Sequence, residues 1–345
     1  MEIFDRMQDL RYGALHLHTD EATGLRAVVA VHNTRLGPGI GGCRCIPYAT
    51  SDAAITDAMR LARGMSYKAA ISGLPHGGAK AVIMLDADRE YDRTALFEAY
   101  GRFVDQIGGA YITCEDSGTS TSDMDIVATQ TRHVLGTSAG SGDPSPYTAL
   151  GVRRGIEAAV KFQLGRDDLD GLHVAVQGVG HVGYYLVKEL HALGARITVA
   201  DINADNVQRC IDDFGVNAVP TSGILSLECD VLAPCALGAV FDDDSIPALN
   251  TKIIAGAANN VLAEDRHGVE LFKRGILYAP DYAINAGGLI NVAIEYSPDG
   301  YDAGRATEQV TGLYDAMWGI FERAKAEDTP THIIADRIVE ERIFG

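Results

Sequence analysis

One stretch of the chain reads Val174-Ala175-Val176-Gln177-Gly178-Val179-Gly180-His181-Val182-Gly183, and its pattern predicts a buried strand that runs directly into a helix. In such a turn Gly178 permits the tight bend, Gly180 lets a pyrophosphate approach the backbone, and Gly183 lets helix and strand pack closely. The helix N-terminus supplies free N–H groups and positive partial charge to the anion. The stretch therefore predicts a dinucleotide site, whose loop also includes Val179, His181 and Val182.

The next predicted strand, Arg196–Ala200, ends at Asp201, which lies 18 residues after Gly183. An acidic side chain at this point accepts hydrogen bonds from an adenosine ribose and repels a 2′-phosphate, which favours NAD over NADP. The competing interpretation is an ordinary α/β crossover with glycines at a turn and a solvated aspartate. The complete order of strand, turn, helix, strand and acid favours the dinucleotide site.

Composition narrows the class of protein. The chain has 345 residues, of which 47% are hydrophobic, and this length predicts two domains. The formal net charge of -18 disfavours nucleic acid and anionic membranes as partners. The start of the chain has no signal-peptide pattern and no apolar run is long enough to span a bilayer, so a cytoplasmic protein is expected. The six cysteines form no C-x-x-C pair and the ten histidines form no H-x-x-x-H pattern, so no metal site is indicated.

The first half of the chain alternates strands and helices. A strand is expected at Leu25–Val31, followed by the glycine-rich segment 37–42, where the backbone must approach another backbone or a ligand. A helix is expected from Ser51 to near Gly64, and the following segment up to Lys80 is interpreted as a turn-rich loop. After a strand at Tyr111–Cys114, Asp116 lies at the carboxyl end, where α/β sheets place ligand-binding groups.

The domain boundary is expected at residues 136–147, which are rich in Gly, Ser and Pro. Residues 1–137 would form an α/β substrate-binding, catalytic and oligomerisation domain, with a C-terminal helix of about residues 325–345 packing back on it. Residues 138–324 would form a Rossmann domain that binds NAD. A cleft between the two domains is expected to close over the substrate and exclude water.

Two lysines are candidates for the chemistry. Lys68 and Lys80 lie twelve residues apart in a glycine-rich segment that could bring both side chains together. Two cations in one cleft repel each other and burial adds a desolvation cost, so the pKa of one lysine would fall toward neutral pH. One amine could then act as a base while the other binds a carboxylate, and Asp116 could accept and return a proton. Spacing alone leaves open that all three are solvated surface charges.

The sequence resembles the amino-acid dehydrogenases of the glutamate/leucine/phenylalanine/valine family, and among them the leucine dehydrogenases. The matching stretches in the first half are L-G-P-G-I-G-G-C-R at residues 36–44, M-S-Y-K at 65–68, G-G-A-K at 77–80, E-D-S-G-T at 115–119 and S-G-D-P-S-P-Y-T-A-L-G-V at 141–152. In the second half they are V-A-V-Q-G-V-G-H-V at 174–182, A-G-A-A-N-N at 255–260, Y-A-P-D-Y-A-I-N-A-G-G at 278–288 and A-D-R-I-V-E-E-R-I at 335–343. Ala79 stands where the family has a third glycine.

The resemblance implies a role for each matching residue. Lys80 would be the general base that activates water, Asp116 its proton-shuttling partner, and Lys68 the group that binds the substrate carboxylate. The carboxylate would also contact Gly42, Met65 and Asn260. The cofactor would contact further residues: Thr148, Cys235, Ala236, Ala257, Asn259 and Asn285. The implied reaction is the reversible, NAD-dependent deamination of an L-amino acid to a 2-oxo acid and ammonia.

The implied side-chain pocket is apolar and consists of Ile40, Cys114, Val134, Leu289 and Val292. A second carboxylate would be buried without a partner there, so glutamate is disfavoured. Cys114 and Leu289 narrow the pocket where aromatic-specific relatives tend to have smaller residues, so leucine, valine and isoleucine are the expected substrates. The alternatives are a phenylalanine or other aromatic amino-acid dehydrogenase of the same family and a non-catalytic, NAD-binding regulatory protein. The resemblance also implies a homo-oligomer, from dimer to octamer.

Overall fold

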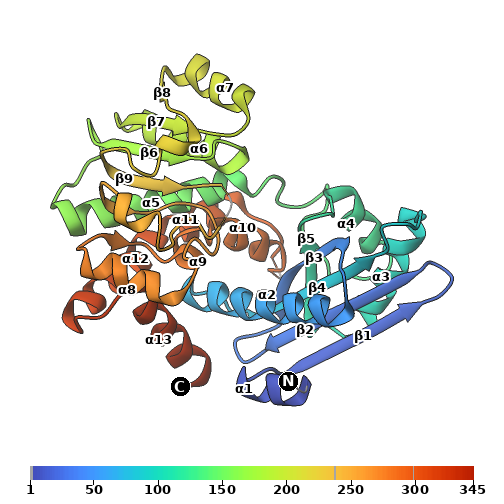
Figure 1. Ribbon diagram of the computed structural model, residues 1–345. Coiled ribbons are helices and arrows are strands. Elements are labelled where there is room, and N and C mark those ends of the chain that lie inside the picture. The colour runs from blue at the N-terminus through green and yellow to red at the C-terminus, as the bar shows by residue number, and fades with distance from the viewer. Residues whose placement is uncertain (1–2, 237, 298) are drawn as a thin grey trace. The chain divides into compact units, whose positions relative to one another are not determined.

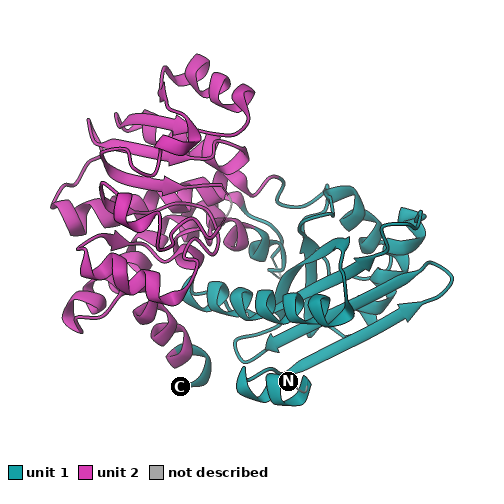
Figure 2. Ribbon diagram, in the orientation of Figure 1, with its two compact units in different colours: residues 1–142, 292–302, 342–345 teal, residues 143–291, 303–341 magenta. Residues whose placement is uncertain are grey.

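The computed structural model describes residues 3–236, 238–297 and 299–345, which form two compact α/β units (Figures 1 and 2). Unit 1 comprises Met1–Gly142, Val292–Asp302 and Arg342–Gly345, and unit 2 comprises Asp143–Asn291 and Ala303–Glu341. The predicted two-domain α/β fold is confirmed. Compared with the predicted ranges, unit 1 also takes in residues 292–302, and unit 2 keeps most of the C-terminal helix.

The C-terminal helix, α13 (Thr331–Phe344), is held to unit 2 by specific hydrogen bonds. Thr331 Oγ1 donates to the carbonyl of Tyr278 at 2.5 Å, and the Tyr282 hydroxyl donates to Asp336 Oδ1 at 2.7 Å. Only Arg342–Gly345 group with unit 1. There Cζ of the Arg11 guanidinium group lies 4.9 Å from the centre of the Phe344 ring. The expectation that residues 325–345 pack on the first domain therefore describes only the end of the helix.

Unit 2 is built on a six-stranded parallel sheet in the order β11-β10-β9-β6-β7-β8. Its strands are β6 (His173–Gln177), β7 (Arg196–Ala200), β8 (Asn217–Ala218), β9 (Cys229–Pro234), β10 (Thr251–Ile254) and β11 (Leu277–Tyr278). The first strand of the unit, β6, lies in the middle between the second and the fourth. This is the Rossmann strand order, and it places a ligand crevice at the carboxyl ends of β6 and β9.

The helices of unit 2 connect these strands and continue to the C-terminus. They are α5 (Ser145–Leu164), α6 (His181–Ala192), α7 (Ala204–Phe214), α8 (Asp265–Lys273), α9 (Asp281–Ile284), α11 (Ala303–Thr311), α12 (Leu313–Ala326), and the short 3₁₀ turns Thr221–Gly223 and Ile246–Ala248. Helix α10 (Gly287–Glu295) begins in unit 2 and ends in unit 1. The strand, turn and helix predicted at residues 174–183 are present as β6 and the start of α6.

Unit 1 contains a mixed five-stranded sheet in the order β1-β2-β4-β3-β5. The strands are β1 (Ala14–Asp20), β2 (Leu25–Asn33), β3 (Gly39–Pro47), β4 (Gly77–Leu85) and β5 (Tyr111–Glu115), and β3 runs parallel to both β4 and β5. The helices are α1 (Ile3–Asp9), α2 (Ser51–Ile71), α3 (Arg93–Gln106) and α4 (Thr121–Ala128).

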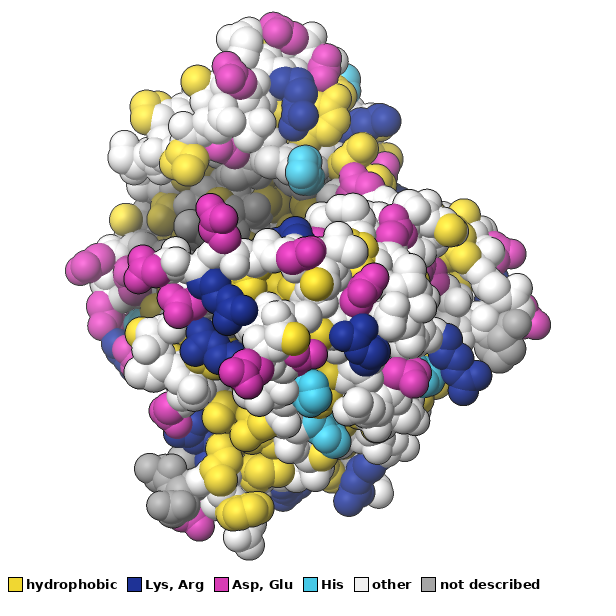
Figure 3. All heavy atoms as spheres, turned by 90° about the vertical axis from the view of Figure 1, so that its right-hand side faces the viewer, with side chains coloured by type: hydrophobic (Ala, Val, Ile, Leu, Met, Phe, Trp, Pro, Cys, Tyr) yellow, Lys and Arg dark blue, Asp and Glu magenta, His cyan; other side chains and the backbone are white. Residues whose placement is uncertain are grey.

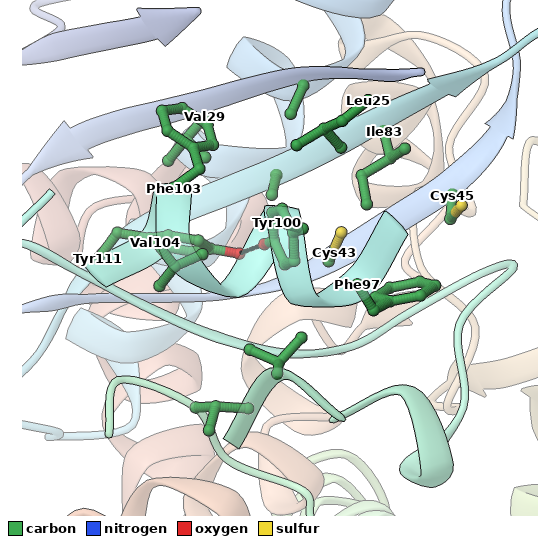
Figure 4. Close-up of a cluster of buried hydrophobic side chains, with 14 of the residues drawn as sticks. Leu25, Val29, Cys43, Cys45, Ile83, Phe97, Tyr100, Phe103, Val104 and Tyr111 are labelled. Carbon is green, nitrogen blue, oxygen red and sulfur yellow. Dashed lines mark hydrogen bonds between the residues drawn. The ribbon is translucent and has the colours of Figure 1, made fainter. Parts of the chain in front are cut away.

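Alternate strand residues face opposite sides of this sheet and form two cores. On one side Val28, Ala30 and Val82 pack against α2. On the other side Leu25, Val29 and Ile83 meet Phe97, Tyr100, Phe103 and Val104 of α3, as Figure 4 shows. We call these the α2 side and the α3 side of the sheet.

Helix α2 is longer than the sequence predicted. It passes through Gly64 and ends at Ile71 because the residues of its last two turns are mostly buried, including Ser66, Tyr67 and Ala70. A glycine inside a helix costs only about 1 kcal/mol, which this burial offsets. Strand β4 in turn begins at Gly77, so the expected loop shortens to residues 72–76. Lys68 therefore lies in a helix and Lys80 in a strand, not in a loop.

The glycines of β3 and β4 allow close approach of backbone to backbone, as one of the two sequence alternatives expected. A methyl group at Gly41 would lie 1.6 Å from the carbonyl oxygen of Ala79. The methyl group of Ala79 itself is buried on the α3 side, and it fits because the position beside it on β3 is Gly39, which has no side chain. The departure from the family's third glycine is thus accommodated away from Lys80.

Acidic and basic side chains intermingle on the face displayed in Figure 3, and hydrophobic side chains gather toward its lower edge. Among the described residues, no helix is both long and apolar enough to cross a membrane.

The contact between α2 and β4 generates a stability prediction. A methyl group at Gly78 would lie 1.9 Å from the backbone nitrogen of Ser66, so Gly78→Ala must push the helix and the strand apart. We expect a loss of about 2–3 kcal/mol in the free energy of unfolding, measured by urea denaturation. Gly64→Ala is the matched control, because no atom in the described part of the chain lies within 4 Å of its added methyl group, and it should stabilise the protein by about 0.5–1 kcal/mol. Equal effects of the two substitutions would contradict this packing.

Candidate active site

Lys80 projects from the α2 side of the sheet in unit 1. It pairs with Ala30 across β2 and β4 and has the same orientation as Val82, two residues further along β4. Its side chain is only 5% exposed. Removing an ammonium group from water disfavours its charged form, so burial lowers the pKa of Lys80 from its ordinary value of 10.5 to about 8. The sequence expectation of a lysine with a lowered pKa is consistent with this environment.

Asp116 follows the carboxyl end of β5, and its carboxylate accepts a hydrogen bond from Lys80 Nζ. The turn that carries it is fixed by Thr119, whose hydroxyl accepts from the Asp116 N–H at 2.8 Å and donates to the Cys43 carbonyl at 3.0 Å. Ser117 N donates to the other carboxylate oxygen of Asp116. The structure therefore brings together two of the three predicted catalytic residues.

Gly42 makes this contact possible. A methyl group at Gly42 would lie 2.8 Å from Cβ of Asp116 and 2.6 Å from the carbonyl oxygen of Glu115. Strand β3 lies between β5 and β4. Because Gly42 of β3 has no side chain, Asp116, which follows β5, can lie over β3 and reach Lys80 on β4. Gly42 was predicted to contribute its backbone to the substrate site, and the structure adds a steric reason for the glycine.

Lys68 and Met65 lie near the end of α2, both half-buried. Ser66 of the same turn contacts the backbone of Gly78, two residues before Lys80, and its hydroxyl is bound to His32 Nδ1 at 2.8 Å. Lys68 is two residues beyond this contact. It also lies eleven residues after Asp57, three helical turns further along the same face of α2.

The sequence analysis missed two charged residues of this site, Arg44 and Asp57. Arg44 is two residues after Gly42 on β3, so it shares the α2 side with Lys80. Its NH1 group donates to Asp57 Oδ2 at 2.8 Å, and its Nε lies 3.5 Å from Asp116 Oδ1. The signal for Arg44 was a charged residue inside an otherwise apolar strand, at even spacing from Gly42. Asp57 on a long helix had no comparable signal.

The predicted apolar pocket is brought together in part. Ile40 and Cys114 both lie on the α2 side, because Cys114 pairs with Gly42 and Ile40 precedes Gly42 by two residues. Burial raises the pKa of the Cys114 thiol to about 11, so the group is neutral at physiological pH. Val134 differs from the expectation, since it bridges to Thr113 and packs on the α3 side of the sheet. Leu289 and Val292 are half-buried and share a face of α10 by their three-residue spacing.

In unit 2 the glycine turn has the geometry that a dinucleotide needs. Gly178 has a φ of 89° and lies against Ala236, and a methyl group at Gly183 would be 2.0 Å from the Gly178 carbonyl oxygen. Among the described residues, nothing lies within 4 Å of a methyl group placed on Gly180, and no side chain caps the α6 N-terminus there. The open approach and the free helix N-terminus are suited to a pyrophosphate. Val179 is buried, Val182 half-buried and His181 exposed.

Asp201 follows β7 and lies directly beside this turn. Its Oδ2 accepts from Val179 N at 2.7 Å, and its Oδ1 accepts from Asn203 N at 2.8 Å. These bonds fix the carboxylate against the glycine loop, and each oxygen keeps a lone pair that a ribose hydroxyl could use.

Further predicted cofactor residues meet at the carboxyl ends of β6, β9 and β10. Cys235 N donates to the Gln177 carbonyl at 2.7 Å, and Asn285 Nδ2 donates to the Ala257 carbonyl at 2.9 Å and to Asn259 Oδ1 at 2.8 Å. Two buried acceptors here, Asn285 Oδ1 and Gln177 Oε1, have no partner within the described part of the chain. Buried acceptors are normally satisfied, so a bound ligand with N–H or O–H groups, such as a nicotinamide ribose, fits this end of the sheet.

Two other predicted residues flank this region of unit 2. Thr148 lies beside Gly288, where a methyl group would be 2.6 Å from its hydroxyl oxygen. Asn260 is exposed and has a φ of 52°, a left-handed conformation that asparagine tolerates better than most residues.

Comparison with known proteins agrees with this geometry. Residues 12–133 match the family described as Glu/Leu/Phe/Val dehydrogenase, dimerisation domain, and residues 203–328 match Glutamate/Leucine/Phenylalanine/Valine dehydrogenase. A leucine dehydrogenase of Thermoactinomyces intermedius is 49% identical over 99% of this chain and 94% of its own length. A valine dehydrogenase of Streptomyces virginiae is 44% identical over 94% of this chain and 91% of its own. The crystal structure of L-tryptophan dehydrogenase from Nostoc punctiforme has a TM-score of 0.89 at 40% identity and covers 99% of this chain and 98% of its own.

A Rossmann sheet in one unit and a buried lysine–aspartate pair in the other define the class of amino-acid dehydrogenases. The family matches and the near-complete coverage of the relatives agree with that class. The chain belongs to the glutamate/leucine/phenylalanine/valine dehydrogenase family, so the resemblance inferred from sequence motifs is confirmed.

The glycine turn can be tested by a single methyl group. Gly180→Ala should leave the urea midpoint unchanged, because the added carbon meets no atom of residues 3–236, 238–297 and 299–345 within 4 Å. It should nevertheless weaken NADH binding at least about tenfold by obstructing the pyrophosphate. Fluorescence titration with NADH measures this loss. Gly223→Ala, at a second open glycine of unit 2, is the control and should bind normally. Normal binding by the Gly180 variant would show that the phosphates lie elsewhere.

Proposed function

We propose that the protein catalyses the reversible, NAD-dependent oxidative deamination of branched-chain aliphatic L-amino acids, namely leucine, valine and isoleucine. The products are the 2-oxo acids and ammonia. The observation that carries the proposal is the buried amine of Lys80, with its lowered pKa, in hydrogen-bond contact with Asp116. A base of this kind can remove a proton from water near neutral pH, which an ordinary lysine cannot.

When bound, NAD supplies the acceptor for the hydride of the substrate α-carbon, and the amino acid thereby becomes an imine. Unprotonated Lys80 then removes a proton from the water molecule that attacks the imine carbon. Asp116 passes this proton from Lys80 to the amino group of the carbinolamine. As the C–N bond breaks and the C=O bond forms, the freed amine of Lys80 takes the proton of the carbinolamine hydroxyl group. The 2-oxo acid and ammonia leave, and Lys80 releases the proton to solvent, which regenerates its amine.

Lys68 is proposed to bind the substrate carboxylate as a permanent cation. Its position supports this role, because Lys68 lies on α2, the helix that covers the side of the sheet from which Lys80 projects, two residues past the contact between α2 and β4. The backbone at Gly42 and Met65 and the side chain of Asn260 would complete carboxylate binding. The two lysines thus have different proposed roles: Lys68 binds the carboxylate as a cation, and Lys80 acts as a base after it loses its proton.

The residues proposed to line the site support the proposed substrate class. Ile40 and the neutral thiol of Cys114 are its apolar residues on β3 and β5, and Leu289 and Val292 are proposed to complete the pocket. A second carboxylate placed there would lose its hydration without gaining a partner, which costs several kcal/mol. The leucine and valine dehydrogenases among the relatives support an aliphatic substrate.

An aromatic amino acid is the second candidate substrate. It is supported by the fold similarity to L-tryptophan dehydrogenase, with its TM-score of 0.89. The choice would depend on Cys114 and Leu289, which are proposed to leave less space for the substrate side chain than smaller residues would.

NAD is the proposed cofactor, because the carboxylate of Asp201, which is held beside the glycine turn, would repel a 2′-phosphate. A homo-oligomer, between a dimer and an octamer, is also proposed. The match of residues 12–133 to a dimerisation domain supports that assembly.

The lowered pKa of Lys80 predicts how activity depends on pH. Only the unprotonated amine acts as a base, so kcat/KM for deamination should rise with pH and level off above about 8. Lys80→Ala should lower kcat by about 10²–10⁴-fold while NADH binding is retained. Lys273→Ala, which removes an exposed lysine of α8, is the control. Normal turnover by the Lys80 variant would place the base elsewhere, and NAD binding without turnover by the wild type would favour a regulatory protein.

The pocket predicts a substrate ranking that a kinetic panel can measure. Leucine, valine and isoleucine should all be oxidised with higher kcat/KM than phenylalanine or tryptophan. Cys114→Gly should raise the ratio of phenylalanine to leucine activity by about tenfold, since a change of this size in an apolar pocket is worth about 1–3 kcal/mol. Wild-type protein that prefers an aromatic amino acid to leucine would establish the second candidate instead.

A further inference from the structure

Arg44 lies between two carboxylates on the α2 side of unit 1. Its NH1 group is 2.8 Å from Asp57 Oδ2, and its Nε is 3.5 Å from Asp116 Oδ1. The Arg44 side chain is 21% exposed, and Nε has no hydrogen-bond partner among the described residues. Because a guanidinium group stays protonated at any physiological pH, Arg44 is a fixed positive charge beside the pair of Lys80 and Asp116.

Asp57 sets the direction of the guanidinium group independently of Asp116. Its carboxylate also accepts from the Tyr48 hydroxyl at 2.7 Å and from Arg60 NH2 at 3.1 Å. The distance from Arg44 Nε to Asp116 is longer than a normal hydrogen bond, so Arg44 acts on that carboxylate as a nearby charge.

We propose that Arg44, held in place by Asp57, is a positioning residue whose fixed charge acts on the pair of Lys80 and Asp116. This inference rests on the proposed function, in which Lys80 is the base. Arg44 reaches the reaction through Asp116 and Lys80 and has no contact with substrate in this scheme.

The charges that face Lys80 have opposite effects. Arg44 on β3 lowers the pKa of Lys80, and Asp57 on α2 raises it. Asp116, beyond β5, is the direct partner of the amine. Lys68 is a further cation on α2.

Two thiols also lie close to Lys80. Cys114 on β5 shares the α2 side with Lys80, and Cys43 on β3 lies on the α3 side. Burial raises the pKa of both thiols, so they are neutral at the pH of the reaction. Arg44 and Asp57 therefore supply two opposite charges near Lys80, and each can be removed separately by substitution.

This arrangement separates an electrostatic role from a structural one. If the ion pair served only to hold β3 against α2, then losing either partner would have the same effect on the pH profile. In the proposed role, loss of the Arg44 charge makes Lys80 harder to deprotonate, and loss of the Asp57 charge makes it easier. The two variants should then shift the pH profile in opposite directions.

The test compares Arg44→Met with Asp57→Asn. We expect the acid limb of kcat/KM for L-leucine with NAD to move up by about half a pH unit in Arg44→Met, which is about a threefold loss of activity on that limb, and to move down in Asp57→Asn. Arg44→Lys keeps the charge and should keep the wild-type midpoint. Arg60→Met is the matched control, because Arg60 binds the same aspartate from an exposed position, and it should leave the profile unchanged.

A second measurement separates this inference from the proposed function. The rate at which the Lys80 amine reacts with acetic anhydride, followed by mass spectrometry against pH, reports its protonation without any turnover. Opposite shifts in labelling, in a protein that oxidises no amino acid, would overturn the proposed function while the effect of Arg44 on Lys80 stands. Shifts of the same sign in both variants, or none, in an active enzyme would overturn the inference about Arg44.

Discussion

The candidate site in unit 1 depends on the burial of one amine, that of Lys80. A lysine whose side chain is 5% exposed is tolerated in a sheet only if a partner meets it and its proton is easily lost. The partner is Asp116, and two local features place its carboxylate beside the amine. Gly42 leaves space over β3, and the hydroxyl of Thr119 fixes the turn after β5. Burial of the ammonium group costs desolvation free energy, and the same burial lowers the pKa of Lys80. The effect that destabilises the charged form is therefore also the effect that would let the amine act as a base.

Both units use glycine in the same way, to bring backbone close to something else. In unit 1, Gly41 and Gly78 allow β3, β4 and α2 to approach one another, and this packing places Lys68 and Lys80 on neighbouring elements. In unit 2, Gly183 brings the first turn of α6 against β6, while Gly180 leaves an open approach to the helix N-terminus. The first arrangement builds a base inside protein, and the second leaves room for an anionic ligand.

The sequence predicted those parts whose local pattern is specific. The strand, glycine turn, helix and following acid around Gly178 led directly to the Rossmann sheet, because each residue there meets a local backbone requirement. The prediction of a turn-rich loop before Lys80 was wrong. Burial of the end of α2 and pairing of β4 with two strands outweigh the turn propensity of the glycines there. Arg44 and Asp57 could not be predicted as a pair, since their contact depends on how α2 lies on the sheet. Val134 likewise lies on the opposite side of the sheet from Ile40, a distinction that only the bridge to Thr113 reveals.

The most direct test of the account is the titration of Lys80 itself in the folded protein. Lysine labelled with ¹³C at Cε gives an NMR signal that moves as the amine loses its proton, and the Lys80 signal can be assigned by its absence from Lys80→Ala. The account predicts a midpoint near pH 8, well below those of the exposed lysines. A midpoint near the ordinary value of 10.5 would show that the amine is solvated and would contradict its role as the base.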